Sequence, residues 1–319
     1  MATYFNRDYK LLHTNQYLTN FAVKYSNGIF VADALAPIVP VDRASDKYPI
    51  YAKERFQWEN TARRDKSDIG ISTESWTDGT YSTMGYALGD WLSKKEMANI
   101  DSQLRGSLRT VEYLREKIAL DREVRTTTLA VADASFATGM TADALVPWDL
   151  FTDATADPLY DIELGIEAVK AATFKMPDSL LLGWKAALKL ALHPKVVVYR
   201  QKVGDMFVSN LGLPPTLLGL KVVVSQSGYS TTKKNATISL SNVLGNYAVV
   251  YCAGSPQYGD ASFLQTFQWA AGRGNDGWEV EESYDGRKKA TFISVEPPEW
   301  NEKCISTSLG YRIGNVLTA

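Results

Sequence analysis

The alternation of polar and apolar positions predicts a long charged hairpin in the first third of the chain. Aromatic residues recur at near-alternate positions early in Val41–Asp90, which is typical of strands, but no apolar stripe forms along this segment. We expect strands over Lys47–Phe56 and Thr80–Trp91, with the polar stretch Arg63–Gly70 as the turn region. A paired segment with no apolar face to bury in its own domain is expected to lie on a neighbouring subunit.

The first long apolar stripe follows this hairpin and predicts a helix from Ser107 to about Ala134. The stripe comprises Val111, Leu114 and Ile118 and continues, with drift, through Leu120, Val124 and Val131. Before it, Ser93-Lys-Lys-Glu96 matches a capping box, which predicts a short helix to about Ile100.

Ahead of the hairpin, residues 1–40 are predicted to form a polar, tyrosine-rich arm. The arm ends in the apolar stretch Gly28–Pro40, which we expect to be a short buried anchor. Pro37 and Pro40 end any helix there and favour extended backbone.

Beyond the long helix the pattern predicts short helices and strands and then a strand-rich end. Asp157-Pro158 supplies an N-cap and a first-turn proline for a helix to about Phe174. A strand over Ser179–Gly183 and a helix over Trp184–Leu192 follow. Further strands are expected over Lys195–Gln201, Leu220–Ser225, Ile238–Ser241, Ala248–Ala253, Trp278–Tyr284, Arg287–Val295 and Ile305–Ile313, with Asp285-Gly286 as a two-residue hairpin turn. The fold class is therefore predicted as α+β.

The composition of the chain excludes several classes of function. The 319 residues are 45% hydrophobic and 22% charged, which is enough apolar content for a sizeable core. The net charge is −2 and no basic block stands out, so nucleic-acid binding through phosphate neutralisation is not indicated. Cys252 and Cys304 lack the spacing of a metal site or a disulfide framework. The chain start lacks the order of a signal peptide and no apolar run could span a membrane, so we expect a protein made in a cytoplasm with no membrane partner.

No residue cluster predicts a catalytic, cofactor or metal site. Gly272–Gly277 has G-x-G-x-x-G spacing, but it leads into a strand-like segment, whereas a dinucleotide site needs a helix there. His13 and His193 are too few for a catalytic triad or a histidine-rich metal site, which leaves carboxylates as the remaining metal chemistry. We expect His193 to cap carbonyls at a helix end.

Two charge clusters are predicted to be surface features. Glu279 and Glu281 share one face of a strand, and we expect Lys288 or its neighbours opposite them across the hairpin. Arg63-Arg64-Asp65-Lys66 mixes both signs, which favours inter-subunit ion pairing at the hairpin tip over a phosphate patch.

The order of these elements resembles that of the tailed-bacteriophage major capsid proteins, whose fold is shared with encapsulins and the herpesvirus capsid floor. The segments that carry the resemblance are Tyr48–Tyr51 and Tyr81–Leu88 for the extended loop, Lys94–Asn99 and Glu112–Glu123 for the connector and spine helix, Pro177–Gly183 and Leu190–Val196 for the axial domain, and Gly245–Tyr251 with the Trp278 hairpin for the return strands.

The resemblance implies five parts: an N-terminal arm over 1–40, an extended loop over 41–92, a peripheral domain with the spine helix over 93–154, an axial α/β domain over 155–255, and return strands of the peripheral domain over 256–319. It also implies inter-subunit contacts. In the loop these are Tyr48, Tyr51, Lys53, Arg55, Phe56, Trp58, Arg63, Arg64, Lys66, Trp76 and Tyr81, and in the arm they are Tyr4, Phe5, Tyr9 and Tyr17.

The function that the resemblance implies is a non-enzymatic shell subunit, without cofactors, that forms pentamers and hexamers of an icosahedral capsid. Its partners would be copies of itself, a portal protein, non-specifically held double-stranded DNA and, in some systems, scaffolding and decoration proteins. The shell would be part of a virion assembled in the host cytoplasm. An encapsulin-type compartment and a nucleotide-binding α/β enzyme are the alternatives.

Some family members join the extended loop to a neighbour through a lysine–asparagine bond. Lys53 and Lys66 lie in the matching region, and Asn275, Asn301 or Asn315 would be the partners. Most members lack this bond, and nothing in the sequence marks a desolvated lysine beside a carboxylate, so we do not expect it here.

Overall fold

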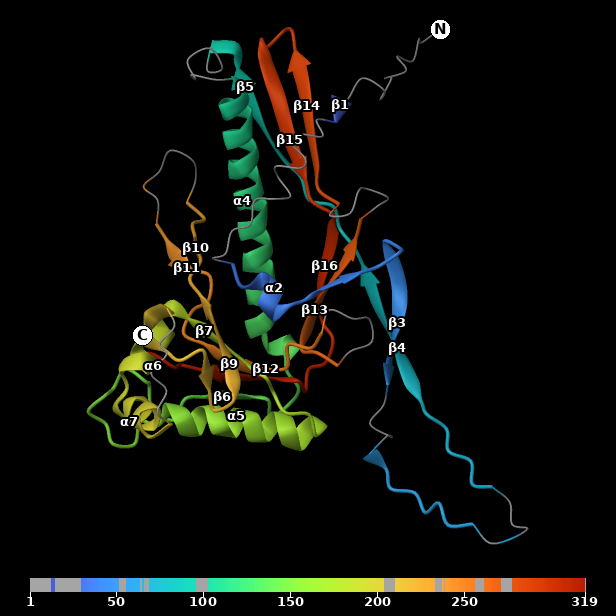
Figure 1. Cartoon of the computed structure of the whole chain (residues 1–319), viewed down its shortest axis with the longest axis vertical. Helices are drawn as coiled ribbons and strands as arrows, with labels where there is room; N and C mark the ends of the chain where they lie inside the picture. The colour runs from blue at the N-terminus through green and yellow to red at the C-terminus, as the bar shows by residue number, and fades with distance from the viewer. Residues whose placement is uncertain are drawn as a thin grey trace.

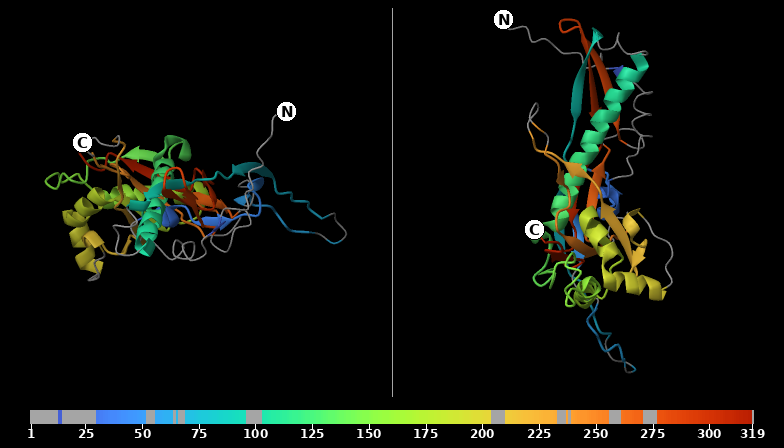
Figure 2. Two further views of the ribbon diagram at one scale, coloured as in Figure 1. Left: turned by 90° about the horizontal axis from the view of Figure 1, so that it is seen from above. Right: turned by 90° about the vertical axis from the view of Figure 1, so that its left-hand side faces the viewer.

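The computed structural model is elongated, with the long helix α4 running along its length (Figures 1 and 2). A sheet lies along one end of α4, an α/β lobe lies at the other end, and a two-stranded loop projects beside that lobe. The structure describes residues 13–14, 30–51, 56–63, 65, 69–95, 103–203, 210–232, 237, 239–255, 261–270 and 277–318. The predicted α+β fold is confirmed.

Helix α4 (Gln103–Val131) confirms the predicted long helix and begins slightly earlier than expected. Its first half buries Val111, Leu114 and Ile118 against a sheet ordered β1–β14–β15–β5, where Ile293 of β15 is also fully buried. The strands of this sheet are β1 (His13–Thr14), β14 (Glu279–Asp285), β15 (Ala290–Glu296) and β5 (Leu88–Ser93).

The second half of α4 differs from the predicted stripe. Leu120, Val124 and Val131 are only half-buried. Apart from Ala130, the buried positions there are polar, namely Arg122, Glu123, Thr126 and Thr127.

The α/β lobe is built on a six-stranded sheet ordered β6–β17–β12–β7–β9–β8. Its strands are β6 (Thr141–Asp143), β17 (Gly310–Gly314), β12 (Ala248–Tyr251), β7 (Ser179–Gly183), β9 (Leu220–Ser225) and β8 (Thr216–Leu217). Every residue of β7 is buried, as expected for a central strand covered on both faces. Shorter elements nearby are the 3₁₀ turns Asp133–Ser135 and Asn210–Gly212 and the two-stranded β10 (Gly228–Tyr229) and β11 (Ser241–Asn242).

Two helices pack on this sheet, and a third packs on those two. Helix α5 (Pro158–Thr173) packs on β17 and β12, and α6 (Trp184–Leu192) packs on β7 and β9. Helix α7 (Pro194–Val203) packs against α5 and α6. The predicted N-cap of α5 is confirmed, because the Asp157 carboxylate accepts the backbone N–H of Tyr160 at 3.3 Å.

A third sheet joins the start of the chain to its end. It is ordered β16 (Glu299–Cys304), β13 (Leu264–Trp269) and β2 (Ile38–Pro40), with β2 parallel to β13. The short helix α2 (Ala32–Leu35) precedes β2, and Leu35 is fully buried. The predicted buried anchor before the hairpin is thus confirmed.

Several predicted strands are wrong. Lys195–Gln201 is part of helix α7, because His193 accepts the Lys195 N–H and caps the helix start, and Pro194 supplies a compatible first-turn residue. His193 therefore caps amide groups rather than the expected carbonyls. Thr80–Trp91 divides between β4 (Trp76–Ser82) and β5, which belong to different sheets.

The end of the chain also differs in detail. The hairpin of β14 and β15 is confirmed, but its closing pair is Asp285↔Ala290, so the loop is longer than Asp285-Gly286. The Asp285 carboxylate accepts N–H groups of Arg287 and Lys288, which stabilises this longer turn. Glu279 lies opposite Glu296, not Lys288. The predicted final strand Ile305–Ile313 is correct only over residues 310–313, in β17, because residues 305–309 form the turn that follows β16. The predicted strand Ile238–Ser241 is wrong for residues 239 and 240, which are not in a strand; Ser241 begins β11, and Ile238 lies outside the described residues. The helix expected to Ile100 lies largely outside the described residues.

Candidate inter-subunit surface on the extended loop

The projecting hairpin of β3 (Ser45–Tyr51) and β4 is the extended loop of this structure. The two strands are antiparallel, in register from Ser45↔Ser82 to Tyr51↔Trp76. Lys47 Nζ lies 3.2 Å from Asp78 Oδ2 across the ribbon. Further out, Ser72 Oγ donates to Glu59 Oε1 at 3.1 Å, so the two sides remain in contact beyond the regular strands.

The root of the loop is fixed by aromatic packing inside its own chain. The Tyr48 and Tyr81 rings lie 5.4 and 4.6 Å from the Phe267 ring of β13, and both tyrosines are buried. A Cβ at Gly79 would lie 2.4 Å from Tyr48 Cζ, so glycine is needed for the ring to lie on β4. Tyr48 and Tyr81, which were expected to contact a neighbouring subunit, have their rings in a core within their own chain, and that contact stays a prediction.

Polar contacts tie the same root to β16. Thr83 Oγ1 donates to Glu299 Oε2 at 2.8 Å, and Lys303 Nζ donates to the Thr80 carbonyl at 2.5 Å. The root is thus attached to the body of the subunit by packing and by hydrogen bonds, which fixes where the ribbon leaves it.

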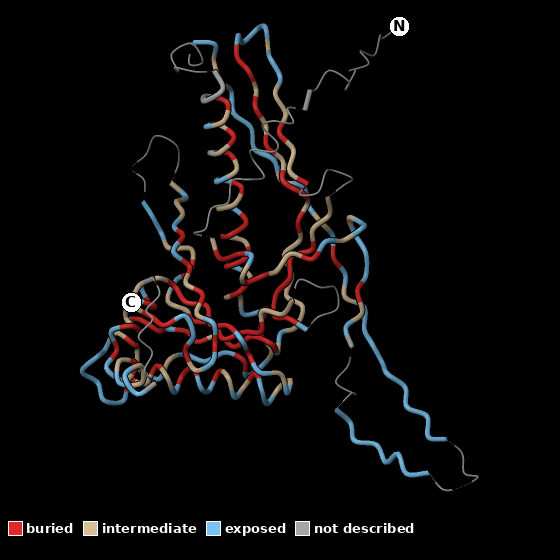
Figure 3. Tube along the Cα trace, viewed as in Figure 1, coloured by how far each residue is buried: buried red, intermediate tan, exposed pale blue. Residues whose placement is uncertain are grey.

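The outer part of the loop is almost entirely exposed (Figure 3). Trp58 is 88% exposed, Trp76 61% and Phe56 58%, and Ile69 and Ile71 are similarly bare. Large apolar side chains exposed on a projecting segment are typical of interaction surfaces. These residues can do no catalysis, but they can provide buried area to a partner.

The remaining predicted contact residues are only partly described. Arg63 is exposed and lies in this outer region. Tyr51 is described only through its backbone pairing. Outside the described residues lie Tyr4, Phe5, Tyr9, Tyr17, Lys53, Arg55, Arg64, Lys66 and Asn275.

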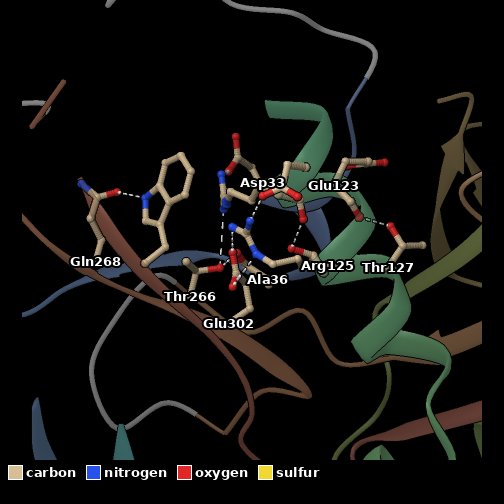
Figure 4. Close-up of polar contacts among 12 residues, drawn as sticks. Asp33, Ala36, Glu123, Arg125, Thr127, Thr266, Gln268 and Glu302 are labelled. Carbon is tan, nitrogen blue, oxygen red and sulfur yellow. Dashed lines mark hydrogen bonds and ion pairs between the residues drawn. The ribbon is translucent and has the colours of Figure 1, made fainter. Parts of the chain in front are cut away.

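A buried polar cluster holds the base of the arm on α4, and sequence reasoning missed it (Figure 4). Glu123 Oε2 accepts the N–H groups of Val31 and Ala32 at 2.9 and 2.8 Å. Its Oε1 accepts the hydroxyls of Ser227 at 3.0 Å and Ser225 at 3.4 Å. Burial raises the pKa of this carboxyl, while these hydrogen bonds oppose the shift.

Two arginines extend the cluster to the third sheet. Arg122 Nη1 lies 2.6 Å from Asp33 Oδ1, and its guanidinium lies 5.0 Å from the Trp300 ring centroid. Arg125 pairs with Glu302 at 2.9 Å and with Asp121 one helical turn away. The available signal was that Arg122 follows Ile118 at helical spacing on the buried face, where a charge requires a partner.

The other chemistry considered from the sequence is not assembled in the described ranges. Gly277 leads into strand β14, so the glycine-rich turn does not begin a helix. His193 is buried at the junction of α6 and α7, where burial lowers its pKa. Among the residues that the structure describes, no three His, Cys, Asp or Glu side chains gather in a way that could hold a metal ion.

None of the helices described here is both long enough and apolar enough to cross a lipid bilayer.

The architecture is that of a capsid shell protein: a spine helix against a peripheral sheet, an α/β lobe, and a projecting two-stranded loop. Comparison with known proteins supports this class. The chain is 28% identical over 234 residues to the major capsid protein of Pseudomonas phage JBD67, covering 72% of this chain and 74% of that protein. It is 29% identical over 199 residues to the major capsid protein of Burkholderia phage BcepMu, covering 59% and 61%. No family model matches the chain.

Solved structures share the fold at lower identity. A phage-related protein from Bordetella bronchiseptica has a TM-score of 0.70 at 20% identity, covering 96% of this chain and 98% of that one. The capsid of cyanophage P-SCSP1u has a TM-score of 0.62 at 10% identity, covering 98% and 92%. An encapsulin from Synechococcus elongatus has a TM-score of 0.55 at 14% identity, covering 92% and 90%. The resemblance drawn from the sequence is confirmed: the chain has the fold of tailed-phage major capsid proteins, and its function is that of a major capsid protein.

Proposed function

We propose that this chain forms pentamers and hexamers that build an icosahedral shell around the double-stranded DNA of a tailed phage. The observation that carries the proposal is the extended loop, whose root is buried in its own chain while its outer aromatic residues are bare. A shell subunit gains stability from many such contacts repeated over identical copies. The phage shell is favoured over an encapsulin-type compartment because the sequence relatives are phage capsid proteins.

The same proposal includes the other partners and the place of assembly. The shell would contact packaged DNA without sequence preference, which suits a chain of net charge −2 with interspersed signs. A portal protein would occupy one vertex, and scaffolding or decoration proteins would be separate chains. Assembly would take place in the host cytoplasm, and the subunit would perform no catalysis.

We also propose the division into arm, extended loop, peripheral domain, axial domain and return strands, with one amendment. Strands β6 and β17 lie outside 155–255 in sequence but belong to the axial sheet. The axial domain would therefore include Thr141–Asp143 and Gly310–Gly314.

The test compares exposed and buried aromatic residues of the loop. Trp58→Ser and Trp76→Ser should leave the thermal midpoint of the isolated subunit unchanged, because both side chains are bare, but should abolish shells in negative-stain micrographs. Tyr81→Ser is the matched control: it should lower the thermal midpoint itself, because its ring lies on Phe267. Shells of normal yield from the doubly substituted Trp58→Ser, Trp76→Ser chain would show that the clamp lies elsewhere.

A further inference from the structure

Phe174, at the end of α5, has a backbone conformation that phenylalanine rarely adopts. Its φ is +56°, in the left-handed region, where helix ends usually carry glycine or asparagine. Its side chain is 65% exposed, so the ring adds little to the core. The residue therefore neither ends the helix well nor packs in the interior, which suggests another role for the ring.

The backbone around Phe174 is held from both sides. The Phe174 N–H donates to the Lys170 carbonyl at 2.8 Å, and Lys170 Nζ returns a bond to the Phe174 carbonyl at 3.0 Å. The next residue, Lys175, donates through Nζ to the Ala261 carbonyl at 2.6 Å. The ring is thus presented from a fixed backbone.

The ring meets the extended loop. The Phe56 ring lies 5.4 Å from the Phe174 ring, tilted by 41°, a favourable aromatic geometry. Phe56 lies beyond β3 in the extended loop, and this loop projects beside the α/β lobe that contains α5 (Figure 1). Two half-exposed rings from distant parts of the chain thus touch where the outer loop meets the α/β lobe.

We propose that Phe174 supports the extended loop of the same chain, and that its contact with Phe56 fixes the direction of the loop in the unassembled subunit. The inference rests on the proposed clamp function of the loop. A loop already aimed at its partner loses less conformational freedom on binding, so the contact favours assembly without adding any inter-subunit area. The strained backbone at Phe174 is retained because glycine, which would fit better, has no ring.

The experiment measures the direction of the loop in unassembled subunits by double electron–electron resonance. Nitroxide labels are attached at Ala62→Cys, in the outer loop, and at Glu167→Cys, on α5, and the distance between them is measured. Both positions are exposed. Cys252 is buried, and burial raises the pKa of the Cys304 thiol to about 11, so the introduced cysteines should label selectively. Test variants are Phe174→Gly and Phe56→Ser, and Tyr160→Ala removes another exposed aromatic ring of α5 as the matched control.

We expect one narrow distance in the labelled parent and in the Tyr160→Ala chain, and a broad distribution in Phe174→Gly and Phe56→Ser. The thermal midpoint of Phe174→Gly should be no lower than that of the parent, because glycine suits the left-handed backbone. A narrow distance that survives both test substitutions, or a parent distance that is broad until shells form, would overturn the proposal. The latter result would mean that Phe174 receives a neighbouring subunit.

The distance is read before assembly, so the outcome separates this inference from the proposed function. Absence of shells would overturn the proposed function. A narrow distance that depends on Phe174 would still support the proposed contact between Phe174 and the loop.

Discussion

Glu123 connects three segments of the chain through one buried carboxylate. Its two oxygens accept hydrogen bonds from the start of α2, at Val31 and Ala32, and from the end of β9 and its following turn, at Ser225 and Ser227. The base of the arm, the spine helix and the α/β lobe therefore share one acceptor. A buried charge of this kind is tolerated because each oxygen has donors.

Two substitutions of Glu123 distinguish the contribution of its hydrogen bonds from that of its charge. Glu123→Ala should lower the free energy of unfolding by about 2–5 kcal/mol, since each buried donor left without an acceptor costs about 1–3 kcal/mol. Glu123→Gln should cost much less at neutral pH, because its carbonyl can accept the two N–H groups and its amide can donate to the serine hydroxyls. Urea unfolding of both chains measures the difference, and equal losses would contradict this account.

The raised pKa of Glu123 sets the sign of a pH effect. The folded chain keeps the proton to higher pH than the unfolded chain, whose carboxyl has its ordinary value of 4.5. The stability from this group is therefore complete below that value and is lost as pH rises through the folded pKa. The stability of the parent chain relative to Glu123→Gln should fall as the pH rises from 4.5 through the folded pKa of Glu123. A difference that stays constant with pH would refute the argument.

Gly79 is required by the Tyr48 ring, and the chain offers a matched control for it. Gly79→Ala should destabilise the loop root by about 1–3 kcal/mol, because the new methyl group overlaps the ring. Gly70→Ala, in the outer loop, should be nearly neutral because nothing lies within 4 Å of its Cβ position. Thermal unfolding of the two chains tests this, and equal effects would show that the ring moves away at little cost.

At the scale of elements, the sequence predicts best where apolar periodicity alone decides the structure. The first half of α4, helix α6 and the strands β7 and β9 follow their apolar pattern closely. The failure at α7 has a local cause: Val196–Tyr199 has high strand propensity, but the cap from His193 and the packing on α5 and α6 favour a helix.

Other failures have distant causes. The polar half of α4 is buried because Glu123 and Arg125 find partners roughly 90 to 180 residues away, at Val31 and Glu302, which no local pattern reveals. The same holds for the loop. The exposure of Trp58 and Trp76 can be predicted from the sequence, because the loop has no apolar stripe that could bury them. The burial of Tyr48 and Tyr81 depends on Phe267 in another sheet.

At the scale of the whole molecule, the lysine–asparagine bond known from some capsids is testable directly. Asn301 is half-buried in β16, and Asn315 is exposed with a φ of +50°. We expect mature particles to run as a single band at 35.3 kDa on a denaturing gel, because nothing in the sequence marks a desolvated lysine beside a carboxylate. A ladder of multiples of that mass would contradict this expectation.

The position of β17 has a consequence for synthesis on the ribosome. Residues Gly310–Gly314 form an interior strand that joins β6 to β12, so the sheet of the α/β lobe cannot close until they have been translated and released from the exit tunnel. Glu302, the partner of Arg125, also comes late. A nascent chain therefore displays its loop before its body is finished. The subunit therefore completes its fold only after the loop has been synthesised. A chain truncated before Gly310 would lack the completed lobe, and it would be degraded by proteases rather than incorporated into the shell.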